Sequence, residues 1–210
     1  MFTGIVTDVG EIVELQRGAE KLQLTVACRY DVATVDVGAS VAHAGVCLTV
    51  VATARRGNRT AITTDVGAET LAVTTLGGWT VGAKANLERS LKIGDELGGH
   101  MVSGHVDGVA EVVERRDFDG MAHFTFRVPA ALAKFIAVKG SVALDGVSLT
   151  VNAVDGDRFE VLLIPHTLEV TTLSDWKVGN GVNIEVDQMA RYAARLVEAG
   201  GFASTAPTAA

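Results

Sequence analysis

The sequence predicts an all-β protein made of two homologous small barrels, followed by one α-helix. Three observations support this prediction. The chain repeats itself at an offset of 97 to 101 residues, its strand-like segments alternate between apolar and polar positions, and a helical period replaces this alternation near the end.

The repeat consists of four blocks that recur in the same order. The matching pairs are 1–14 with 101–114 (7 of 14 identical), 37–50 with 138–151 (9 of 14), 69–76 with 166–173 (6 of 8) and 79–88 with 176–185 (5 of 10). This agreement indicates the duplication of a domain of roughly 90 residues. Two copies are too few for a solenoid, so each copy must close its own core or pair with the other.

Short strands account for most of each copy. KLQLTVAC, NRTAITT, AHFTFRV and DRFEVLLI alternate or run apolar and are rich in β-branched residues. RRGNR and VDGDR are typical of hairpin turns, because Gly, Asn and Asp tolerate positive φ. About six strands per copy predict a small closed barrel, and closure would leave no sheet edge exposed. PAALAKFIA (129–137) is expected to form a short helix that begins near Pro129.

The carboxyl-terminal segment has a different period. Asp187 is expected to cap a helix that Gly200–Gly201 ends. One face of this helix is apolar, and the stripe either packs on its own barrel or meets other copies of the chain. The stripe consists of Met189, Tyr192, Ala193, Leu196 and Val197. We therefore divide the chain into a first barrel (1–97), a second barrel (98–186), and a helix with a frayed tail (187–210).

Composition and charge exclude several classes of protein. The net charge is −7 and the basic residues are scattered, so we expect no nucleic-acid partner. The start of the chain lacks the basic region of a signal peptide, and no apolar run reaches the length of a membrane span. Cys28 and Cys47 form neither a disulfide framework nor a zinc site. We expect a cytoplasmic protein that binds no membrane and no metal.

Five motifs occur in order between Met1 and about Val197: MFTGIV, GASVAHAGVCLTV, GGHMVSGHVDG, LDGVSLTV and IPHTLEVTTL. Together they resemble the riboflavin synthase family of the α-chain type. The resemblance implies two six-stranded antiparallel Greek-key barrels, a C-terminal helix that builds a homotrimer, and no cofactor. It also implies active sites between the first barrel of one subunit and the second barrel of another, and an association with lumazine synthase.

The reaction that the resemblance implies is the last step of riboflavin biosynthesis. Two molecules of 6,7-dimethyl-8-ribityllumazine exchange a four-carbon unit, which gives riboflavin and 5-amino-6-ribitylaminouracil. A duplicated barrel suits a reaction that consumes two identical substrates. Holding both in a near-attack pose is worth up to roughly 7–11 kcal/mol.

Positions that agree between the copies, together with the resemblance, predict the substrate-binding residues. Short hydroxyls and backbone amides suit a flat heterocycle with a polyol tail. The predicted residues are Phe2, Thr3, Gly4, Ile5, Val6, Cys47, Leu48, Thr49, Asp65, Glu69, Thr70, Ser103, Gly104, His105, Val106, Lys139, Ser148, Leu149, Thr150, Leu162, Leu163, Ile164, Pro165, His166 and Thr167.

Positions that differ between the copies are candidates for distinct catalytic roles. His105 replaces Ile5 and is either a structural histidine or the base that takes a proton from the acidic methyl at C7 of the lumazine. Cys47 is either a small buried residue or a group acting at C7, and Ser148 is its counterpart. Because a thiolate forms more readily than an alkoxide, this exchange would make the two sites inequivalent.

The other candidates carry weaker signals. Asp145, which replaces Ala44, either orients Ser148, contacts the lumazine or forms an ordinary Asp–Gly turn. Thr150 completes the predicted catalytic set. Lys139 either reaches ribityl hydroxyls or is solvated.

Three further histidines carry less information. His166 stands where the family usually has an acid, so no carboxylate role is assigned there. His43 and His100 are interpreted as structural histidines.

Two other classes of protein share parts of this pattern. A non-catalytic antenna protein that binds lumazine or flavin would have the same fold, but the intact CLTV and SLTV segments and His105 favour an enzyme. A reductase-type flavin barrel would need a GxGxxG-like loop after a strand, which this sequence lacks.

Overall fold

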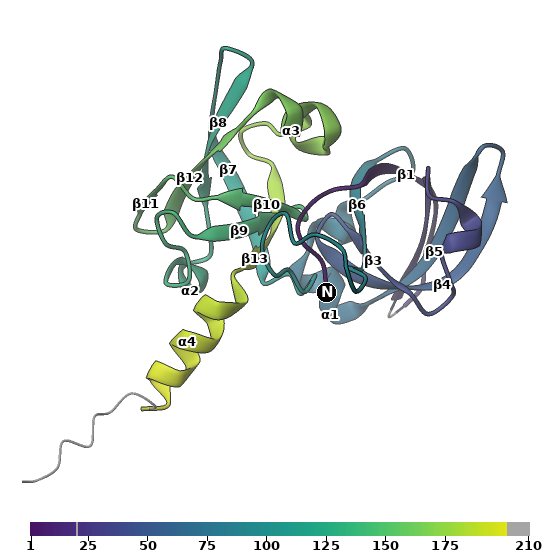
Figure 1. Ribbon diagram of the computed structural model, residues 1–210, viewed down its shortest axis with the longest axis horizontal. Helices are drawn as coiled ribbons and strands as arrows, with labels where there is room; N and C mark the ends of the chain where they lie inside the picture. The colour runs from purple at the N-terminus through teal and green to yellow at the C-terminus, as the bar shows by residue number, and fades with distance from the viewer. Residues whose placement is uncertain (20, 201–210) are drawn as a thin grey trace, which may run out of the picture.

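The structure is a computed structural model that describes residues 1–19 and 21–200, so the expected tail at 201–210 lies outside the described residues. Two β-barrels lie side by side, and the amino terminus lies close to the contact between them (Figure 1). A helix projects away from the second barrel (Figure 1). The division at residues 97 and 98 stays a prediction.

The first barrel is closed by six antiparallel strands. They are β1 (Asp8–Arg17), β2 (Lys21–Cys28), β3 (Ser40–His43), β4 (Val46–Arg56), β5 (Arg59–Gly67) and β6 (Lys84–Arg89). The neighbours around the barrel follow the order β1-β2-β5-β4-β3-β6, which is a Greek-key arrangement. Its connections carry η1 (Val32–Thr34), α1 (Ala68–Val73) and η2 (Thr75–Gly78).

The second barrel repeats this order with one interruption. Its strands are β7 (Gly108–Phe118), β8 (Met121–Arg127), β9 (Ser141–Leu144), β10 (Val147–Thr150), β11 (Ala153–Asp155), β12 (Arg158–Leu163) and β13 (Gly181–Val186). The sheet order is β10-β9-β13-β7-β8-β12-β11. Strands β10 and β11 are the two halves of the counterpart of β4, separated at Val151 and Asn152. The predicted all-β fold of two barrels and a terminal helix is therefore confirmed.

Local predictions hold for the turns and only in part for the helices. Arg56 pairs with Arg59, and Asp155 with Arg158, across the two expected hairpin turns. The helix expected at 129–137 is the short α2 (Ala130–Ala133). Two further α-helices, α1 and α3 (Pro165–Val170), and the short 3-10 helices η1, η2 and η3 (Thr172–Asp175) were not predicted. Six residues are too few for a helical period to show in the sequence.

Each barrel encloses its own apolar core, and a small third cluster lies between them. The second core is aromatic, with Trp176 edge-on to Phe124 and Phe126 at 5.4 Å. The third cluster contains Phe2, Ala42, Val102 and Ala143, with Cys47 packed against it. The barrels are thus joined by buried apolar surface and do not merely touch.

Two asparagines bind the barrels to each other reciprocally. Asn86 of β6 donates to the carbonyl of Asp145 (3.0 Å) and accepts from the amide of Thr172 (2.8 Å). Its counterpart Asn183 of β13 donates to the carbonyl of Ala44 (2.9 Å) and accepts from the amide of Thr75 (2.7 Å). Both side chains are buried, so these hydrogen bonds fix the relative orientation of the barrels.

The turns of the two repeated hairpins abut at the same junction. Gly45 and Gly146 both have φ near the left-handed region, at +81° and +79°. A Cβ on Gly45 would lie 2.8 Å from the amide nitrogen of Gly146. Only glycine satisfies both the backbone conformation and this close approach.

Two crossing segments, residues 2–6 and 102–106, connect each half of the chain to the opposite barrel. They pair with each other through Phe2 and Val102, with N–H···O distances of 2.7 and 3.1 Å. Val6 then packs against the core of the second barrel, and Val106 packs against the core of the first. Each barrel is therefore completed by the segment that precedes the other.

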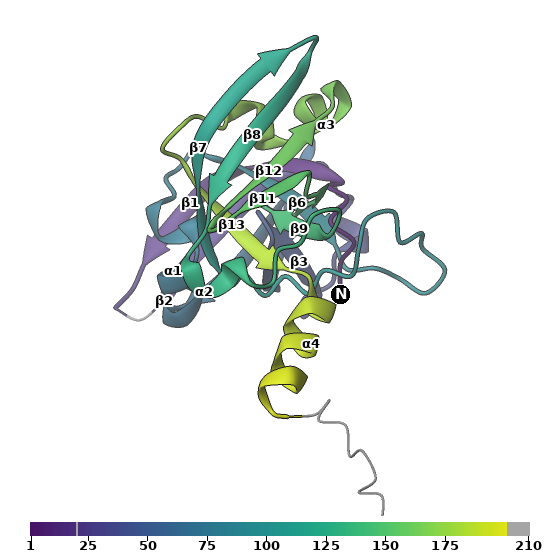
Figure 2. The same cartoon turned by 90° about the vertical axis from the view of Figure 1, so that its left-hand side faces the viewer.

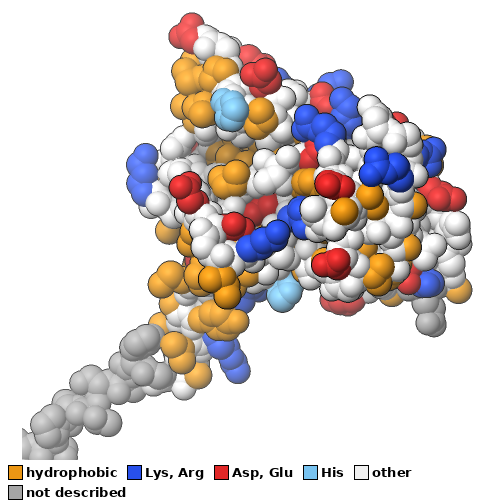
Figure 3. Space-filling view, turned by 45° about the vertical axis from the view of Figure 1, so that its right-hand side comes forward, with side chains coloured by type: hydrophobic (Ala, Val, Ile, Leu, Met, Phe, Trp, Pro, Cys, Tyr) orange, Lys and Arg blue, Asp and Glu red, His pale blue; other side chains and the backbone are white. Residues whose placement is uncertain are grey.

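The terminal helix α4 (Gln188–Glu198) begins as expected, because the Asp187 side chain accepts from the amide of Met189 (2.8 Å). Arg191 holds it against the second barrel through two bonds to Asp107 (2.5 and 2.8 Å). The helix extends away from the barrels (Figure 2), and apolar side chains gather on its surface (Figure 3). Four of its residues are 52–75% exposed: Met189, Tyr192, Leu196 and Val197. The alternative in which the stripe packs on its own barrel is therefore wrong.

The described helices include none that is both long and apolar enough to cross a bilayer.

The buried His43 side chain lowers the stability of the first barrel in a way that can be measured. Its ring is fully buried, and its Nε2 has no hydrogen-bond partner among the described residues, whereas the second barrel places Leu144 at this position. Burial lowers the pKa of His43 to about 4. Between pH 4 and 6.5 the unfolded chain therefore binds more protons than the folded chain, and the stability falls as the pH is lowered through this range.

We expect His43→Leu to raise the free energy of unfolding by about 1–3 kcal/mol at pH 7.5, because an orphaned polar group is removed. At pH 5 the gain should be about 2 kcal/mol larger. Urea unfolding at both pH values measures this. His166→Leu, at an exposed site, is the matched control and should change stability by less than about 0.5 kcal/mol. A gain in the free energy of unfolding that is equal at both pH values would contradict the lowered pKa of His43.

Candidate active site

The first candidate site combines β4 of the first barrel with the crossing segment 102–106. Along β4 the side chains of Val46, Leu48 and Val50 face the core, so Cys47 and Thr49 point outward. The amide of Cys47 donates to the carbonyl of Gly104 (2.9 Å). A Cβ on Gly104 would lie 2.6 Å from that of Cys47. The exposed His105 follows Gly104 directly, so it stands one residue from the backbone contact with Cys47.

The second candidate site repeats this geometry with the partners exchanged. Ser148 of β10 points outward from the second barrel, and its amide donates to the carbonyl of Gly4 (2.8 Å). A Cβ on Gly4 would lie 2.6 Å from that of Ser148. Ile5 follows and is 47% exposed. The crossing segments thus group residues 3–6 with Ser148, and residues 103–106 with Cys47.

Buried carboxylates fix both crossing segments. Glu88 accepts from the amides of Thr3 (2.6 Å) and Gly4 (3.0 Å), and Glu185 accepts from those of Ser103 (2.7 Å) and Gly104 (2.8 Å). Burial raises the pKa of both glutamates, and these hydrogen bonds oppose that rise. Neither residue was predicted to belong to the site.

His100 also belongs to this second site, although the sequence analysis interpreted it as a structural histidine. Its Nδ1 lies 2.7 Å from the hydroxyl oxygen of Ser148. Burial lowers the pKa of His100, although the negative charge of Asp187 opposes this, so the neutral imidazole can accept the hydroxyl proton. The repeat comparison begins at Met101 and leaves His100 outside the compared positions.

Comparison with known proteins agrees with the duplicated domain. A family model described as the lumazine binding domain matches residues 3–90 and 103–187. The chain belongs to the riboflavin synthase family of lumazine-binding proteins. It is 54% identical to a riboflavin synthase of Brucella abortus over 199 residues, which cover 94% of this chain and 98% of the relative. It is 44% identical to a riboflavin synthase of Photobacterium phosphoreum, with coverages of 94% and 89%.

A solved structure shares the architecture of this riboflavin synthase family member. The crystal structure of LumP complexed with riboflavin superposes with a TM-score of 0.79, covering 89% of this chain and 99% of LumP. The sequences are 24% identical. This similarity shows the fold alone.

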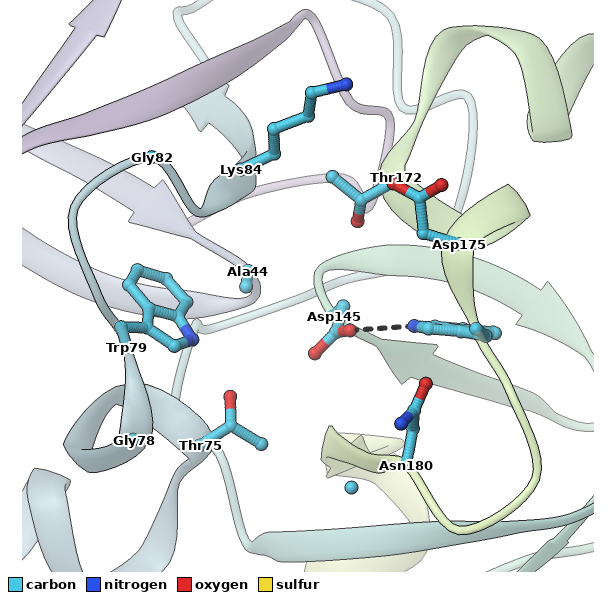
Figure 4. A pocket seen from close by; sticks show the side chains of 12 residues that line it. Ala44, Thr75, Gly78, Trp79, Gly82, Lys84, Asp145, Thr172, Asp175 and Asn180 are labelled. Atoms are coloured by element: carbon cyan, nitrogen blue, oxygen red, sulfur yellow. Dashed lines mark hydrogen bonds between the residues drawn. The ribbon is translucent and has the colours of Figure 1, made fainter.

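Asp145 occupies a different place from Ser148. Its carboxylate accepts from the indole nitrogen of Trp176 (3.0 Å) and the amide of Asn183 (2.9 Å), as the dashed line in Figure 4 shows for Trp176. The carboxylate is enclosed at the barrel junction, although the residue keeps some exposed surface, and burial raises its pKa to about 7. It lines a groove of about 610 Å³ together with Trp79 and Lys84.

Several predicted binding residues lie in the interior and not at the sites. Phe2, Leu48, Leu149 and Leu163 are at most 9% exposed and belong to the apolar clusters. They support the walls from which their neighbours project. Thr49 and Thr150 are exposed beside Cys47 and Ser148, as the strand alternation requires.

The remaining predicted residues flank the short helices of each barrel. In the first barrel, Glu69 and Thr70 lie on α1, and Asp65 is bound by Lys21 (3.0 Å) and Gln23 (2.9 Å), which lower its pKa. In the second barrel, Leu162 and Ile164 are 37% and 52% exposed.

The second barrel also contains the predicted binding segment 165–167 and the predicted binding residue Lys139. The segment 165–167 begins α3, with Pro165 and His166 exposed and Thr167 partly buried. Lys139 stands in an exposed turn at φ +65°. Among the described residues, no hydrogen bond joins these positions to the crossing segments, so their binding roles stay predictions.

Proposed function

We propose that this chain is a riboflavin synthase that transfers a four-carbon unit between two molecules of 6,7-dimethyl-8-ribityllumazine. The products are riboflavin and 5-amino-6-ribitylaminouracil. The observation that carries this proposal is the pair of intact, reciprocal sites, in which each barrel wall meets the crossing segment of the other half. The full-length similarity to riboflavin synthases supports it.

The two sites offer different chemistry to identical substrates. In the first, His105 takes a proton from the C7 methyl of one lumazine, and the C–H electron pair stays on the heterocycle. In the second, Ser148 is hydrogen-bonded to His100 and is the group best placed to act at C7 of the other lumazine. Thr49 and Thr150 are proposed to bind the heterocycles, and the segments at 65–70 and 162–167 their ribityl chains.

We further propose that the enzyme is a cytoplasmic homotrimer assembled through α4, with each first barrel facing a second barrel of the next subunit. The exposed stripe on α4 supports assembly, because a contiguous apolar face on a terminal helix favours a partner. Open site walls also favour completion by another subunit. An association with lumazine synthase remains part of this proposal.

The direct test is incubation with 6,7-dimethyl-8-ribityllumazine alone, followed by its absorbance and by chromatography of the products. We expect riboflavin and 5-amino-6-ribitylaminouracil in equal amounts. Tight binding of the lumazine without riboflavin formation would instead identify an antenna protein.

We expect His105→Ala to lower turnover by about 100-fold or more, because it removes the proposed base. Its side chain is exposed, so the unfolding free energy should change by less than about 0.5 kcal/mol. Steady-state kinetics and urea unfolding measure the two effects. His123→Ala, in a β8 strand of the second barrel, serves as a comparison outside the site. Equal losses of activity in both variants would contradict the assignment of His105 as the base.

Removal of the chain from Asp187 onward should leave folded barrels that sediment as monomers, with turnover lowered by about 100-fold because the two substrates are no longer held together. Leu196→Lys, on the stripe, should also weaken assembly, whereas the exposed Arg195→Ala should not. Analytical ultracentrifugation reports the assembly state. A fully active trimer after truncation would show that α4 plays no part in assembly.

A further inference from the structure

The two crossing segments are held by buried carboxylates. Glu185 is 2% exposed, and its two oxygens accept separately from the amides of Ser103 (2.7 Å) and Gly104 (2.8 Å). Glu88 is 6% exposed and binds the amides of Thr3 and Gly4 in the same way, with a further bond from the Thr3 hydroxyl (2.8 Å). The arrangement is a clamp of two backbone donors on one carboxylate.

These carboxylates are not neutralised by a directly bonded cation, although the amino-terminal ammonium lies within coulombic range of Glu88 and Arg191 within that of Glu185. Among the residues that the structure describes, neither Glu88 nor Glu185 takes part in an ion pair. A buried carboxylate without a cation costs folding energy unless hydrogen bonds compensate for its lost hydration. An apolar side chain would serve the barrel interior better, so the position of each glutamate is best explained by the segment that it holds.

What each clamp holds differs between the two sites. Glu185 fixes Gly104, whose φ of +77° turns the chain so that its carbonyl meets the amide of Cys47 and the next residue, His105, projects to the surface. Glu88 fixes Gly4 at φ +76° in the same way, but the next residue is Ile5. One clamp therefore presents an imidazole, and the other presents a side chain that cannot take a proton.

We propose that Glu185 is a positioning residue for proton transfer to His105, while Glu88 only shapes the binding surface of the other site. This inference rests on the proposed function. A base acts efficiently only when it is held within hydrogen-bond reach of the proton that it removes, and a displacement of about 1 Å can cost 100-fold in rate. In the step, the C7 methyl C–H bond breaks, the proton moves to His105, and the electron pair stays delocalised in the lumazine.

Glutamine is the matched substitution at both positions. Glu185→Gln keeps the side-chain volume and one acceptor, but its NH₂ group then faces a backbone N–H, so one bond of the clamp is lost. Glu88→Gln makes the same change at the site whose crossing segment carries Ile5 where the other carries His105. The two variants therefore separate loss of a clamp from loss of the positioned base.

The measurement is the exchange of the C7 methyl protons of 6,7-dimethyl-8-ribityllumazine for deuterium in D₂O, followed by ¹H NMR and corrected for exchange without enzyme. We expect Glu185→Gln to slow enzyme-catalysed exchange by about 10- to 100-fold. Glu88→Gln should slow this proton exchange by less than about 3-fold, because its crossing segment presents no base, but it should lower riboflavin formation by weakening the binding surface of the other site. In an His105→Ala background, Glu185→Gln should have no further effect, because the glutamate acts through the imidazole.

Equal effects of the two glutamine variants, or a further loss in the His105→Ala background, would overturn the proposal. If Glu185→Gln does not fold, Glu185→Asp keeps the charge, shortens the clamp by one methylene, and is judged by the same criteria. A parent enzyme that exchanges the methyl protons and forms riboflavin, with an equally active Glu185→Gln, would refute this inference alone. A parent enzyme that does neither would refute the proposed function.

Discussion

The reciprocal hydrogen bonding at the barrel junction is the constraint on which the rest of the structure depends. Asn86 and Asn183 each donate to a turn of the other barrel and accept from the segment that follows its short helix. Because Gly45 and Gly146 carry no side chains, the two turns can approach closely. The close approach of the turns brings β4 and β10 within reach of the crossing segments. The two candidate sites depend on this contact between strand and crossing segment.

The same junction makes the two sites similar in shape but different in chemistry. Each wall offers an outward side chain followed two residues later by a threonine, and each crossing segment offers a glycine carbonyl to the strand. The groups around these shared features differ. One site combines the Cys47 thiol with the His105 imidazole, while the other combines the Ser148 hydroxyl with the imidazole of His100. Two copies of one substrate bound at the proposed sites would therefore meet unlike surroundings, which suits a reaction in which one molecule donates a four-carbon unit and the other accepts it.

The repeats and the period-two pattern were sufficient to predict the two barrels and the terminal helix, because these depend on local alternation and on the duplication itself. Strand alternation could also have placed Leu48 and Leu149 in the interior, since each neighbours an outward-facing candidate. The exchange of crossing segments could not be predicted, because a contact between Gly4 and Ser148 depends on how the barrels dock. Glu88 and Glu185 were conspicuous only as matching acids, and their role follows from backbone amides that carry no sequence signal.

The crossing segments have a consequence for protein engineering. A hybrid made by joining the first 97 residues of this chain to the second half of a relative would contain no site inherited whole from either parent. Its Cys47 would face a foreign histidine loop, and its Gly4 would lie against a foreign serine. To transplant one intact site, the exchanged unit must be discontinuous: one barrel, together with the five-residue crossing segment that precedes the other barrel.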